Sequence, residues 1–485
     1  MDFQKWNKQF IGGVWREGSN NKILENRNPF TDEVLVELKL ANTQDVDEAY
    51  ESANEAQKQW VKVPASKKVE IIESAITAIE RRQSELVEIL IAEAGSTQMK
   101  AKLEFLGLAV AIMKEAATYP YRMVEETVPS IIPGKENRLI HLPLGVVGVI
   151  APWNVPFHLA MRSVISALAT GSGVVLKPAS FTFISGGLVM AEIFEEAGLP
   201  SGLFNVVIGA GSDIGDYFVE HPIPRMISFT GSTEVGQRIG SLASKHLKKT
   251  ALELGGNNAF IVLDDADLEQ AASAAVFGKF MNQGQICMAI NRFVVDRKVY
   301  QPFIEKFKGK VQMLKSGDPT DPTTDIGPLI ERKQVDQIKS LIDMSIKEGA
   351  SFALEGRIEG NLMSPYILMD VNNEMEIAQT EIFGPVAIII PVENEEEAIA
   401  VANHSLFGLS GSVFSKSVER GVSVANQIHT GMIHVNDQSI NDEPHIAFGG
   451  EKASGIGRFN GKWALDEFTT IKWVSVQHSP REFPF

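Results

Sequence analysis

The sequence predicts an α/β fold built around a doubly wound parallel sheet. Between residues 145 and 263, short apolar runs alternate with stretches of helical periodicity, which is the pattern of repeated strand–helix units. The runs are almost continuously apolar, as in strands buried on both faces, and a helical stretch over residues 183–197 stops at Gly198. The predicted strands cover residues 146–150, 173–177, 203–207, 226–229 and 259–263.

Regions of mixed structure flank this sheet. Short strands and turns are expected over residues 11–40, and Gly95 is expected to cap a long preceding helix. The other predicted helices and strands, in chain order, are helices over residues 46–60, 66–94, 100–117, 268–280, 333–349 and 396–403, and strands over residues 386–391 and 432–435.

A β-hairpin is predicted over residues 128–142, which lack helical periodicity and contain a Pro133-Gly134 turn. The alternating residues 471–476 predict an exposed strand that extends this hairpin. Because an isolated hairpin is only marginally stable in water, we expect it to pack on something else, such as a partner subunit.

The composition excludes several classes of function. The 485 residues carry a formal net charge of −16, which gives no basis for binding nucleic acid or an anionic membrane, although local helix N-termini still permit an anionic cofactor. We expect neither a signal peptide nor a membrane-spanning helix. A single cysteine excludes intramolecular disulfides and thiolate metal clusters, leaves no metal site predicted, and fits a cytoplasmic location.

That cysteine, Cys287, is the first candidate for chemistry. It follows the polar, glycine-containing segment 282–286, and loops of this kind often carry function. A free cysteine is more often a small buried hydrophobe, so this segment alone leaves a core thiol and a nucleophile equally plausible.

The predicted strand ends hold further polar candidates, because ligands of open parallel sheets bind there. The glycines in residues 231–236 lead straight into a helix and favour a phosphate site, although simple capping by Ser232 or Thr233 is the alternative. The glycine-rich segment 209–215 is a weak dinucleotide-binding signal. Glu253 lies among leucines and glycines, so it is either a salt-bridged structural residue or a general base with a raised pKa.

Seven short motifs follow one another along the chain. They are Pro152-Trp153-Asn154, Lys177-Pro178, Phe229-Thr230-Gly231-Ser232, Glu253-Leu254-Gly255-Gly256, Gly284-Gln285-Ile286-Cys287, Glu381-Ile382-Phe383-Gly384-Pro385 and Phe448-Gly449-Gly450. In this order they resemble the NAD(P)-dependent aldehyde dehydrogenases, and the resemblance covers nearly the whole chain. Residues 434–437 and 441–445 are similar to the benzaldehyde and vanillin dehydrogenase branch of that family.

The resemblance implies an aldehyde dehydrogenase-like domain organisation and a homodimer or homotetramer. A doubly wound NAD(P)-binding domain, an α/β catalytic domain carrying the cysteine, and a β-hairpin oligomerisation element are expected. Their implied extents are residues 1–122 and 144–254 for the cofactor domain, 255–455 for the catalytic domain, and 123–143 and 456–485 for the oligomerisation segments.

The resemblance also implies a mechanism centred on Cys287. Its sulfur would attack the aldehyde carbon to form a thiohemiacetal, while the Asn154 amide and the backbone N–H of Cys287 hold the oxyanion. Hydride transfer to the nicotinamide would leave a thioester, and Glu253 would activate the water that hydrolyses it. Because an ordinary cysteine is only a few per cent thiolate at neutral pH, some activation of the thiol is expected.

NAD is the cofactor that the resemblance implies, with some acceptance of NADP. Lys177 is expected on the adenosine ribose, Gly231 and Ser232 at the pyrophosphate, Glu381 on the nicotinamide ribose and Phe383 against the nicotinamide. The expected cofactor set is completed by Trp153, Ser180, Gly209, Phe229 and Gly236.

Two positions depart from the pattern of the family. Ser180 stands where many NAD-restricted relatives carry a glutamate that repels a 2′-phosphate, so NADP becomes electrostatically tolerable. Phe459 stands where some relatives have another acid, so Glu253 is expected to be indispensable for deacylation.

An aromatic aldehyde is the expected substrate, because the motifs are flanked by the apolar residues Val155, Leu159, Met281, Ile286 and Met288. Such residues are also common in plain cores. An aliphatic aldehyde or a semialdehyde is the alternative substrate. A cysteine thioesterase, an acylating dehydrogenase using coenzyme A and a non-enzymatic binding protein are weaker alternatives.

Overall fold

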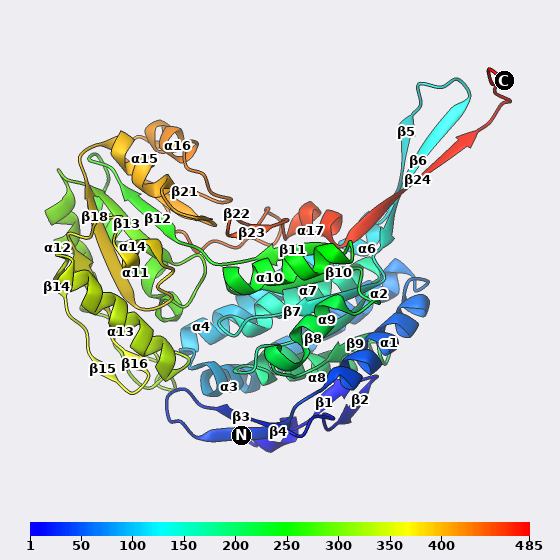
Figure 1. Cartoon of the computed structure of the whole chain (residues 1–485), viewed down its shortest axis with the longest axis horizontal. Helices are drawn as coiled ribbons and strands as arrows, with labels where there is room; N and C mark the ends of the chain where they lie inside the picture. Colours follow the sequence, from blue (N-terminus) through cyan, green and yellow to red (C-terminus); the bar gives the residue numbers. More distant parts are fainter.

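An eight-stranded sheet organises the larger part of the computed structural model, which describes residues 1–485 (Figure 1). Its strands are β1 (Gln9–Ile11), β2 (Val14–Arg16), β7 (Val146–Ile150), β8 (Gly173–Lys177), β9 (Phe204–Val206), β10 (Met226–Thr230), β11 (Lys249–Glu253) and β23 (Gly455–Ile456). They lie in the order β2-β1-β9-β8-β7-β10-β11-β23. The five central strands, β9, β8, β7, β10 and β11, are mutually parallel. The order reverses between β7 and β10, and ligands of doubly wound sheets bind beside such a point.

Helices cover both faces of this sheet, which confirms the doubly wound prediction. On one face α1, α9 and α10 pack over the strands, and on the other face α7 and α8 pack together with α2, α3 and α5. These helices and their short neighbours are α1 (Thr43–Trp60), α2 (Ala65–Arg81), α3 (Gln83–Ala94), α4 (Gln98–Lys102), α5 (Val110–Ala116), α6 (Tyr119–Arg122), α7 (Pro156–Thr170), α8 (Val189–Glu196), α9 (Asp216–Glu220) and α10 (Thr233–Lys245).

A second, seven-stranded sheet forms the other half and has the order β14-β17-β18-β13-β12-β20-β21. Its strands are β12 (Asn258–Val262), β13 (Ile290–Asp296), β14 (Ser351–Leu354), β17 (Tyr366–Met369), β18 (Val386–Val392), β20 (Gly411–Phe414) and β21 (His434–Val435). One face is covered by α11 (Leu268–Phe280) and α12 (Tyr300–Val311). The other face is covered by α13 (Arg332–Lys347), α14 (Glu376–Gln379), α15 (Glu395–Asn403) and α16 (Val418–Ala425).

The predicted hairpin and the C-terminal strand form one projecting arm (Figure 1). The strand β5 (Glu125–Pro129) pairs with β6 (Lys135–Pro143), and β24 (Thr469–Gln477) pairs with the other edge of β6. The register runs from Thr469 opposite Pro143 to Gln477 opposite Lys135. The prediction that residues 471–476 extend the hairpin is confirmed.

Short elements complete the chain. They are the strand pairs β3 (Ile23–Arg27) with β4 (Val34–Lys39), β15 (Ile358–Glu359) with β16 (Leu362–Met363), and β19 (Phe407–Gly408) with β22 (Glu451–Lys452), the helix α17 (Gly461–Glu467), and the 3₁₀ or π turns η1 (Phe3–Trp6), η2 (Leu103–Ala109), η3 (Ile184–Leu188), η4 (Gly211–Gly215) and η5 (Met281–Gly284). None of the helices combines the length and apolarity needed to cross a bilayer.

The structure corrects one strand assignment and adds a strand. The strand predicted at residues 259–263 exists as β12, but it pairs with β13 and β20 in the second sheet. Its expected place in the first sheet is taken by β11. This strand begins with the polar residues Lys249 and Thr250, so it lacks the continuous apolar run by which the other strands were predicted. Apolar patterning identifies a strand but does not choose its neighbours.

Two helix predictions also differ from the structure. The helix predicted over residues 66–94 is divided into α2 and α3 at Arg82, whose backbone is not helical (φ −89°, ψ 11°). Apolar spacing continues across this break, so periodicity does not reveal it. Gly95 caps α3 in the left-handed region at φ 62°, as predicted. The helix predicted over residues 100–117 contains the π-helical turn η2 between α4 and α5.

The substitution Gly236→Ala is expected to destabilise the fold by about 1–3 kcal/mol, because its Cβ would lie 2.2 Å from Leu254 Cδ2 in packed surroundings. Gly240→Ala on the same helix is the matched control. Its Cβ would meet Leu252 Cδ1 at 3.4 Å, an ordinary contact, and alanine gains ~1 kcal/mol of helix propensity there. Chemical denaturation compares the two, and equal stability of both variants would contradict the tight packing of α10 on β11.

Candidate functional site

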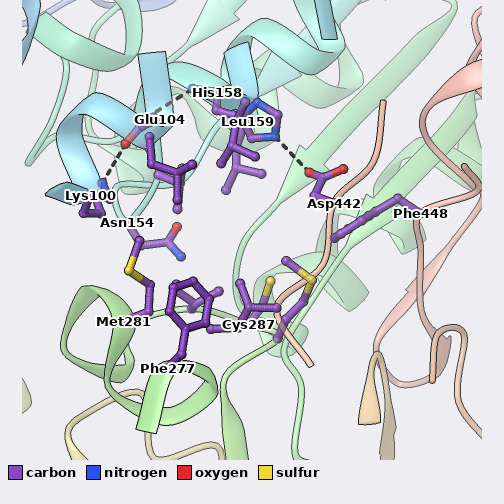
Figure 2. Close-up of a pocket in the computed structure, with 16 residues that line it drawn as sticks. Lys100, Glu104, Asn154, His158, Leu159, Phe277, Met281, Cys287, Asp442 and Phe448 are labelled. Atoms are coloured by element: carbon purple, nitrogen blue, oxygen red, sulfur yellow. Dashed lines mark hydrogen bonds and ion pairs between the residues drawn. The ribbon is translucent and has the colours of Figure 1, made fainter. Parts of the chain in front are cut away.

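A mostly apolar cavity lies where the carboxyl ends of strands in the first sheet meet the amino ends of strands in the second (Figure 2). Eleven of its 16 lining residues are hydrophobic. They come from four segments that are far apart in the sequence, residues 100–108, 154–159, 277–288 and 440–448. Cys287 and Asn154 both line this cavity, so the fold brings two of the predicted catalytic residues together.

A strained turn presents Cys287. Asn282, Gln283 and Gly284 take three consecutive left-handed conformations, with φ of 51°, 58° and 73°. Backbone of this kind persists only where its surroundings hold it. The Asn258 amide does so by donating to the carbonyl oxygen of Cys287 at 2.7 Å. The cysteine therefore lies in a fixed loop beside the cavity and not within a regular element.

Asn154 is tied to the same loop. It follows β7, is 6% exposed, and its Nδ2 donates to the carbonyl oxygen of Gln285 at 2.9 Å. In return, the Asn282 amide donates to the carbonyl oxygen of Asn154 at 3.1 Å. Because a side-chain amide has two N–H donors, one donor of Asn154 remains for a ligand in the cavity.

Glu253 ends β11 and is 2% exposed, and neither of its carboxyl oxygens has a hydrogen-bond partner. Burial raises the pKa of Glu253 to about 8, opposed by the positive charges of Arg162 and Arg458. The structure contains no salt bridge to Glu253, which removes the structural alternative left open by the sequence. A carboxyl with this pKa is poised to exchange protons near neutral pH.

The surroundings of Cys287 oppose the expected activation of its thiol. Burial, together with the nearby carboxyls of Glu381 and Glu253, raises the pKa of the Cys287 thiol to about 12. The thiol is therefore neutral at physiological pH in this structure.

The predicted phosphate site has the features that an anion needs. Ser232 is the N-cap residue of α10, but its side chain makes no capping hydrogen bond. The Thr233 hydroxyl donates to the carbonyl oxygen of Ala453 instead. The capping alternative is therefore not what the structure contains, and the first N–H groups of α10 remain for an anion.

Lys177 lies nearby in the sheet, at the end of β8. It is 8% exposed and forms no ion pair, and burial lowers the pKa of its ammonium group to about 8. An unpaired, largely buried lysine and an open helix N-terminus at the same end of the sheet, with β7 between their strands, fit a cofactor that carries ribose hydroxyls and phosphates. Ser180 follows it in a partly buried position that adds no charge.

Phe383 and Trp153 come together from different sheets, and Glu381 lies two residues before Phe383. Glu381 accepts a hydrogen bond from the Gly256 backbone at 3.0 Å, and burial raises the pKa of Glu381 to about 7. Phe383 has a left-handed backbone (φ 51°), and its ring meets the Trp153 ring edge-on at 5.5 Å between centroids. Trp153 follows β7 of the first sheet, whereas Phe383 precedes β18 of the second.

Packing accounts for four of the other residues predicted to bind the cofactor. Phe229 is 5% exposed in the cluster between α10 and the sheet. A Cβ on Gly231 would lie 2.5 Å from its ring, and a Cβ on Gly209 would lie 2.4 Å from Ile214. The Leu254 side chain packs so closely against Gly236 that a Cβ there would collide with it, as described above. Direct cofactor contacts of these residues stay predictions.

The comparisons with known proteins decide the family. The model of the aldehyde dehydrogenase family matches residues 15–474. The chain belongs to this family. Its general reaction oxidises an aldehyde with reduction of NAD(P), so the chain is an enzyme and the resemblance seen in the seven motifs is confirmed.

Several relatives of this aldehyde dehydrogenase match it over their full length. It is 53% identical over 485 residues to the benzaldehyde dehydrogenase YfmT of Bacillus subtilis, covering 100% of both chains. It is 50% identical over 474 residues to the vanillin dehydrogenase of Corynebacterium glutamicum, covering 97% of this chain and 98% of that one. Among solved structures, an NAD-dependent benzaldehyde dehydrogenase from Corynebacterium glutamicum has a TM-score of 0.89 at 47% identity, covering 97% and 98%. A salicylaldehyde dehydrogenase from Pseudomonas putida G7, complexed with salicylaldehyde, has a TM-score of 0.96 at 34% identity, covering 99% of each chain.

The sequence alone did not identify the buried polar side of the aldehyde dehydrogenase cavity (Figure 2). Lys100 pairs with Glu104 at 2.6 Å, and the second oxygen of Glu104 accepts the backbone N–H of Phe157 at 2.8 Å, at the start of α7. His158 Nε2 lies 2.9 Å from an oxygen of Asp442. The four-residue spacing of Lys100 and Glu104 was a usable signal for a helical pair. No local pattern connects His158 with Asp442.

Alkylation of Cys287 by iodoacetamide in the cofactor-free enzyme is expected to accelerate by about tenfold per pH unit from pH 7 to pH 10, because the thiolate reacts and its pKa is near 12. Mass spectrometry of the intact chain measures the rate. Cys287→Ser supplies the blank, since no other cysteine is present. A rate that levels off below pH 9 would contradict the raised pKa.

Proposed function

We propose that the enzyme oxidises an aromatic aldehyde of the benzaldehyde or vanillin type to the carboxylic acid, through a thiohemiacetal and a thioester on Cys287. The observation that carries this proposal is the mostly apolar cavity that has Cys287 and Asn154 in its wall. Its apolar lining includes the rings of Phe277 and Phe448, which suit the faces and edges of a planar ring.

The substrate class is supported by two independent observations. The five apolar residues expected from the sequence, Val155, Leu159, Met281, Ile286 and Met288, all line the cavity. The similar proteins named above carry the names of benzaldehyde, vanillin and salicylaldehyde dehydrogenases. A small aliphatic aldehyde would leave much of this apolar wall uncovered, and so would gain less from burial.

The residues of the chain divide the chemistry among them. The Cys287 thiol gives its proton to the Glu253 carboxylate, which passes it on to solvent, as the sulfur attacks the carbonyl carbon. The free N–H of Asn154 and the backbone N–H of Cys287 hold the resulting oxyanion. NAD, when bound, supplies the hydride acceptor. Glu253 then accepts a proton from the water that attacks the thioester, for which its carboxylate form is required. Release of the acid restores the thiol.

The cofactor is proposed to be NAD, with some acceptance of NADP. Lys177 would bind the adenosine ribose, Gly231 and Ser232 the pyrophosphate, and Glu381 the nicotinamide ribose. The unpaired ammonium of Lys177 and the uncapped start of α10 support this assignment. The neutral Ser180 supports the acceptance of NADP, since it places no negative charge against a 2′-phosphate.

A homodimer or homotetramer assembled through the projecting arm is also proposed. In the sheet order β24-β6-β5, β24 is an edge strand with unpaired backbone groups, and its side chains Ile471 and Trp473 are 57% and 62% exposed. Exposed apolar edge strands invite pairing with another chain. The cytoplasmic location expected from the sequence stays a prediction.

A panel of aldehydes assayed with NAD and NADP tests the reaction and the substrate class. We expect kcat/KM for benzaldehyde and vanillin to exceed that for acetaldehyde and propanal by about tenfold or more, because each buried CH₂-sized group adds about 0.8 kcal/mol. NADP is expected to support a lower but measurable kcat/KM. Faster oxidation of short aliphatic aldehydes would overturn the substrate class, and absolute rejection of NADP would overturn the argument from Ser180.

Two variants test the assigned roles in the same assay. Cys287→Ala is expected to abolish turnover. Glu253→Gln is expected to lower kcat by roughly 10²–10⁴-fold, the usual contribution of a general base. Thermal unfolding of both variants controls for folding. Full activity of Glu253→Gln would remove Glu253 from the mechanism.

Light scattering after size-exclusion chromatography tests the assembly. The wild type is expected to be larger than a monomer, and the double substitution Ile471→Glu and Trp473→Glu is expected to shift it toward monomer, because two buried charges oppose pairing. Lys472→Ala, on the same exposed strand, is the matched control and should leave the mass unchanged. A monomeric wild type would contradict the proposal.

A further inference from the structure

Arg162 is a buried cation without a hydrogen bond. It lies on α7 and is 1% exposed, and none of its three guanidinium nitrogens donates to a protein acceptor. The guanidinium lies between two aromatic rings, 4.4 Å from the centroid of Phe448 and 4.6 Å from that of Phe459. Stacking of this kind attracts the cation, but it neither neutralises its charge nor satisfies its donors. A buried charged group whose donors make no hydrogen bond requires a physical explanation.

Glu253 has the complementary property. Its carboxyl group is also buried, and both of its oxygens lack a donor. The site therefore contains a buried guanidinium group and a buried carboxyl group, and neither makes a hydrogen bond to the rest of the protein. Each is costly in a low-dielectric interior unless a nearby opposite charge offsets it.

The backbone of the Phe448-Gly449-Gly450 motif connects the two groups. A Cβ on Gly449 would lie 3.1 Å from Glu253 Oε1 and 2.8 Å from the Arg458 Cδ, so this backbone passes directly against the Glu253 carboxyl group. The preceding residue, Phe448, stacks on Arg162. The segment that holds the guanidinium in place is thus the segment that contacts the acid.

Asp442 is a second anion beside the same cation. Its Oδ2 lies 3.6 Å from Arg162 Nη1, too far for a hydrogen bond but within ion-pair range. Asp442 is already satisfied, because Oδ2 is 2.9 Å from His158 Nε2 and Oδ1 accepts from Asn460 Nδ2 at 2.7 Å. Arg162 is therefore shared between an anion that has hydrogen-bond partners and an acid that has none.

We propose that Arg162 is a positioning residue that supplies the counter-charge with which the buried Glu253 ionises, and that Asp442 competes for that counter-charge. This inference rests on the proposed function, in which Glu253 acts as the base in thioester hydrolysis. Arg162 touches neither the sulfur nor a substrate in this role. It sets how readily Glu253 gives up its proton to become the required carboxylate.

The charges that face Glu253 support this direction of effect. They are Arg162 from α7, Arg458 from the segment after β23, Asp442 from the segment before β22, and the Cys287 thiol. Burial raises the pKa of Glu253, Arg162 is the largest influence that lowers it, Arg458 follows, and Asp442 raises it. Arg458 is less suited to the role, since it already donates to the Gly450 and Gly457 carbonyl oxygens and pairs with Glu451.

This role also explains Phe459, which is fully buried. Phe459 is the residue noted above as differing from some relatives, which carry an acid at this position. Its ring forms one side of the pocket for the guanidinium, and its backbone is hydrogen-bonded to that of Phe448 in both directions, at 2.8 and 3.1 Å. An acid here would pair with Arg162 and withdraw it from Glu253, whereas a phenyl ring leaves the charge available.

The pH dependence of kcat, at saturating NAD and benzaldehyde, tests the proposal. In the wild type, kcat should rise with pH as Glu253 ionises. The ascending limb of the pH–kcat profile, called the limb below, should therefore lie near the raised pKa of Glu253, about 8. Arg162→Met keeps a flexible apolar side chain between the two rings and removes the charge, so the limb should move to higher pH by ~1–3 units. Arg162→Lys keeps the charge and should move the limb less.

Asp442→Asn is expected to shift the limb in the opposite direction along the pH axis. It removes the competing anion, so the limb should move to lower pH, an outcome that general damage to the site would not produce. Thermal unfolding midpoints of all variants check that each protein is folded at every pH used. Superimposable limbs for wild type and Arg162→Met, or an upward shift with Asp442→Asn, would overturn the proposal.

Glu253→Gln separates this inference from the function on which it rests. Loss of the limb in the residual activity of Glu253→Gln assigns the limb to Glu253. If the limb survives in Glu253→Gln, the proposed base is wrong and the inference falls with it. If the limb is lost there but is unmoved in Arg162→Met, Glu253 keeps its role and only the counter-charge is rejected.

Discussion

The burial of ionisable groups where the two sheets meet is the constraint on which the site depends. Removing a charge from water is costly, so a buried acid or base is driven toward its neutral form. Burial raises the pKa of Glu253 to about 8 and that of Glu381 to about 7, and it lowers the pKa of Lys177 to about 8. Groups that would carry fixed charges in water therefore titrate near neutral pH, where proton transfer is useful.

The arrangement of the two sheets produces this burial. The carboxyl ends of β7 and β11 supply Asn154 and Glu253, and the segment before β13 supplies Cys287. Two consecutive glycines allow these parts to approach. A Cβ on Gly255 would lie 2.5 Å from Glu381 Oε2, and a Cβ on Gly256 would lie 2.2 Å from the carbonyl oxygen of Cys287. Any larger residue at either position would push the reactive groups apart.

Local pattern was sufficient for much of the fold but not for its pairing. Continuous apolar runs located β7, β8, β9 and β10, and glycine predicted the end of α3, because both signals depend on a few neighbouring residues. The same reasoning assigned residues 259–263 to the wrong sheet and overlooked β11, which begins with Lys249 and Thr250. Strand partners depend on contacts between segments that are distant in the sequence, and no local pattern records them.

For the site, the sequence by itself determined which residue types were available: one thiol, a leucine-flanked acid, an amide and a lysine at strand ends, in the order of a known family. Only the tertiary structure decided their state. It showed that Glu253 has no hydrogen-bond partner, that Ser232 does not cap its helix, and that Arg162 lies between two rings without a hydrogen bond. The physical reason is that hydrogen-bond satisfaction, solvation and charge sharing are properties of neighbours in space, whereas a motif records only neighbours along the chain.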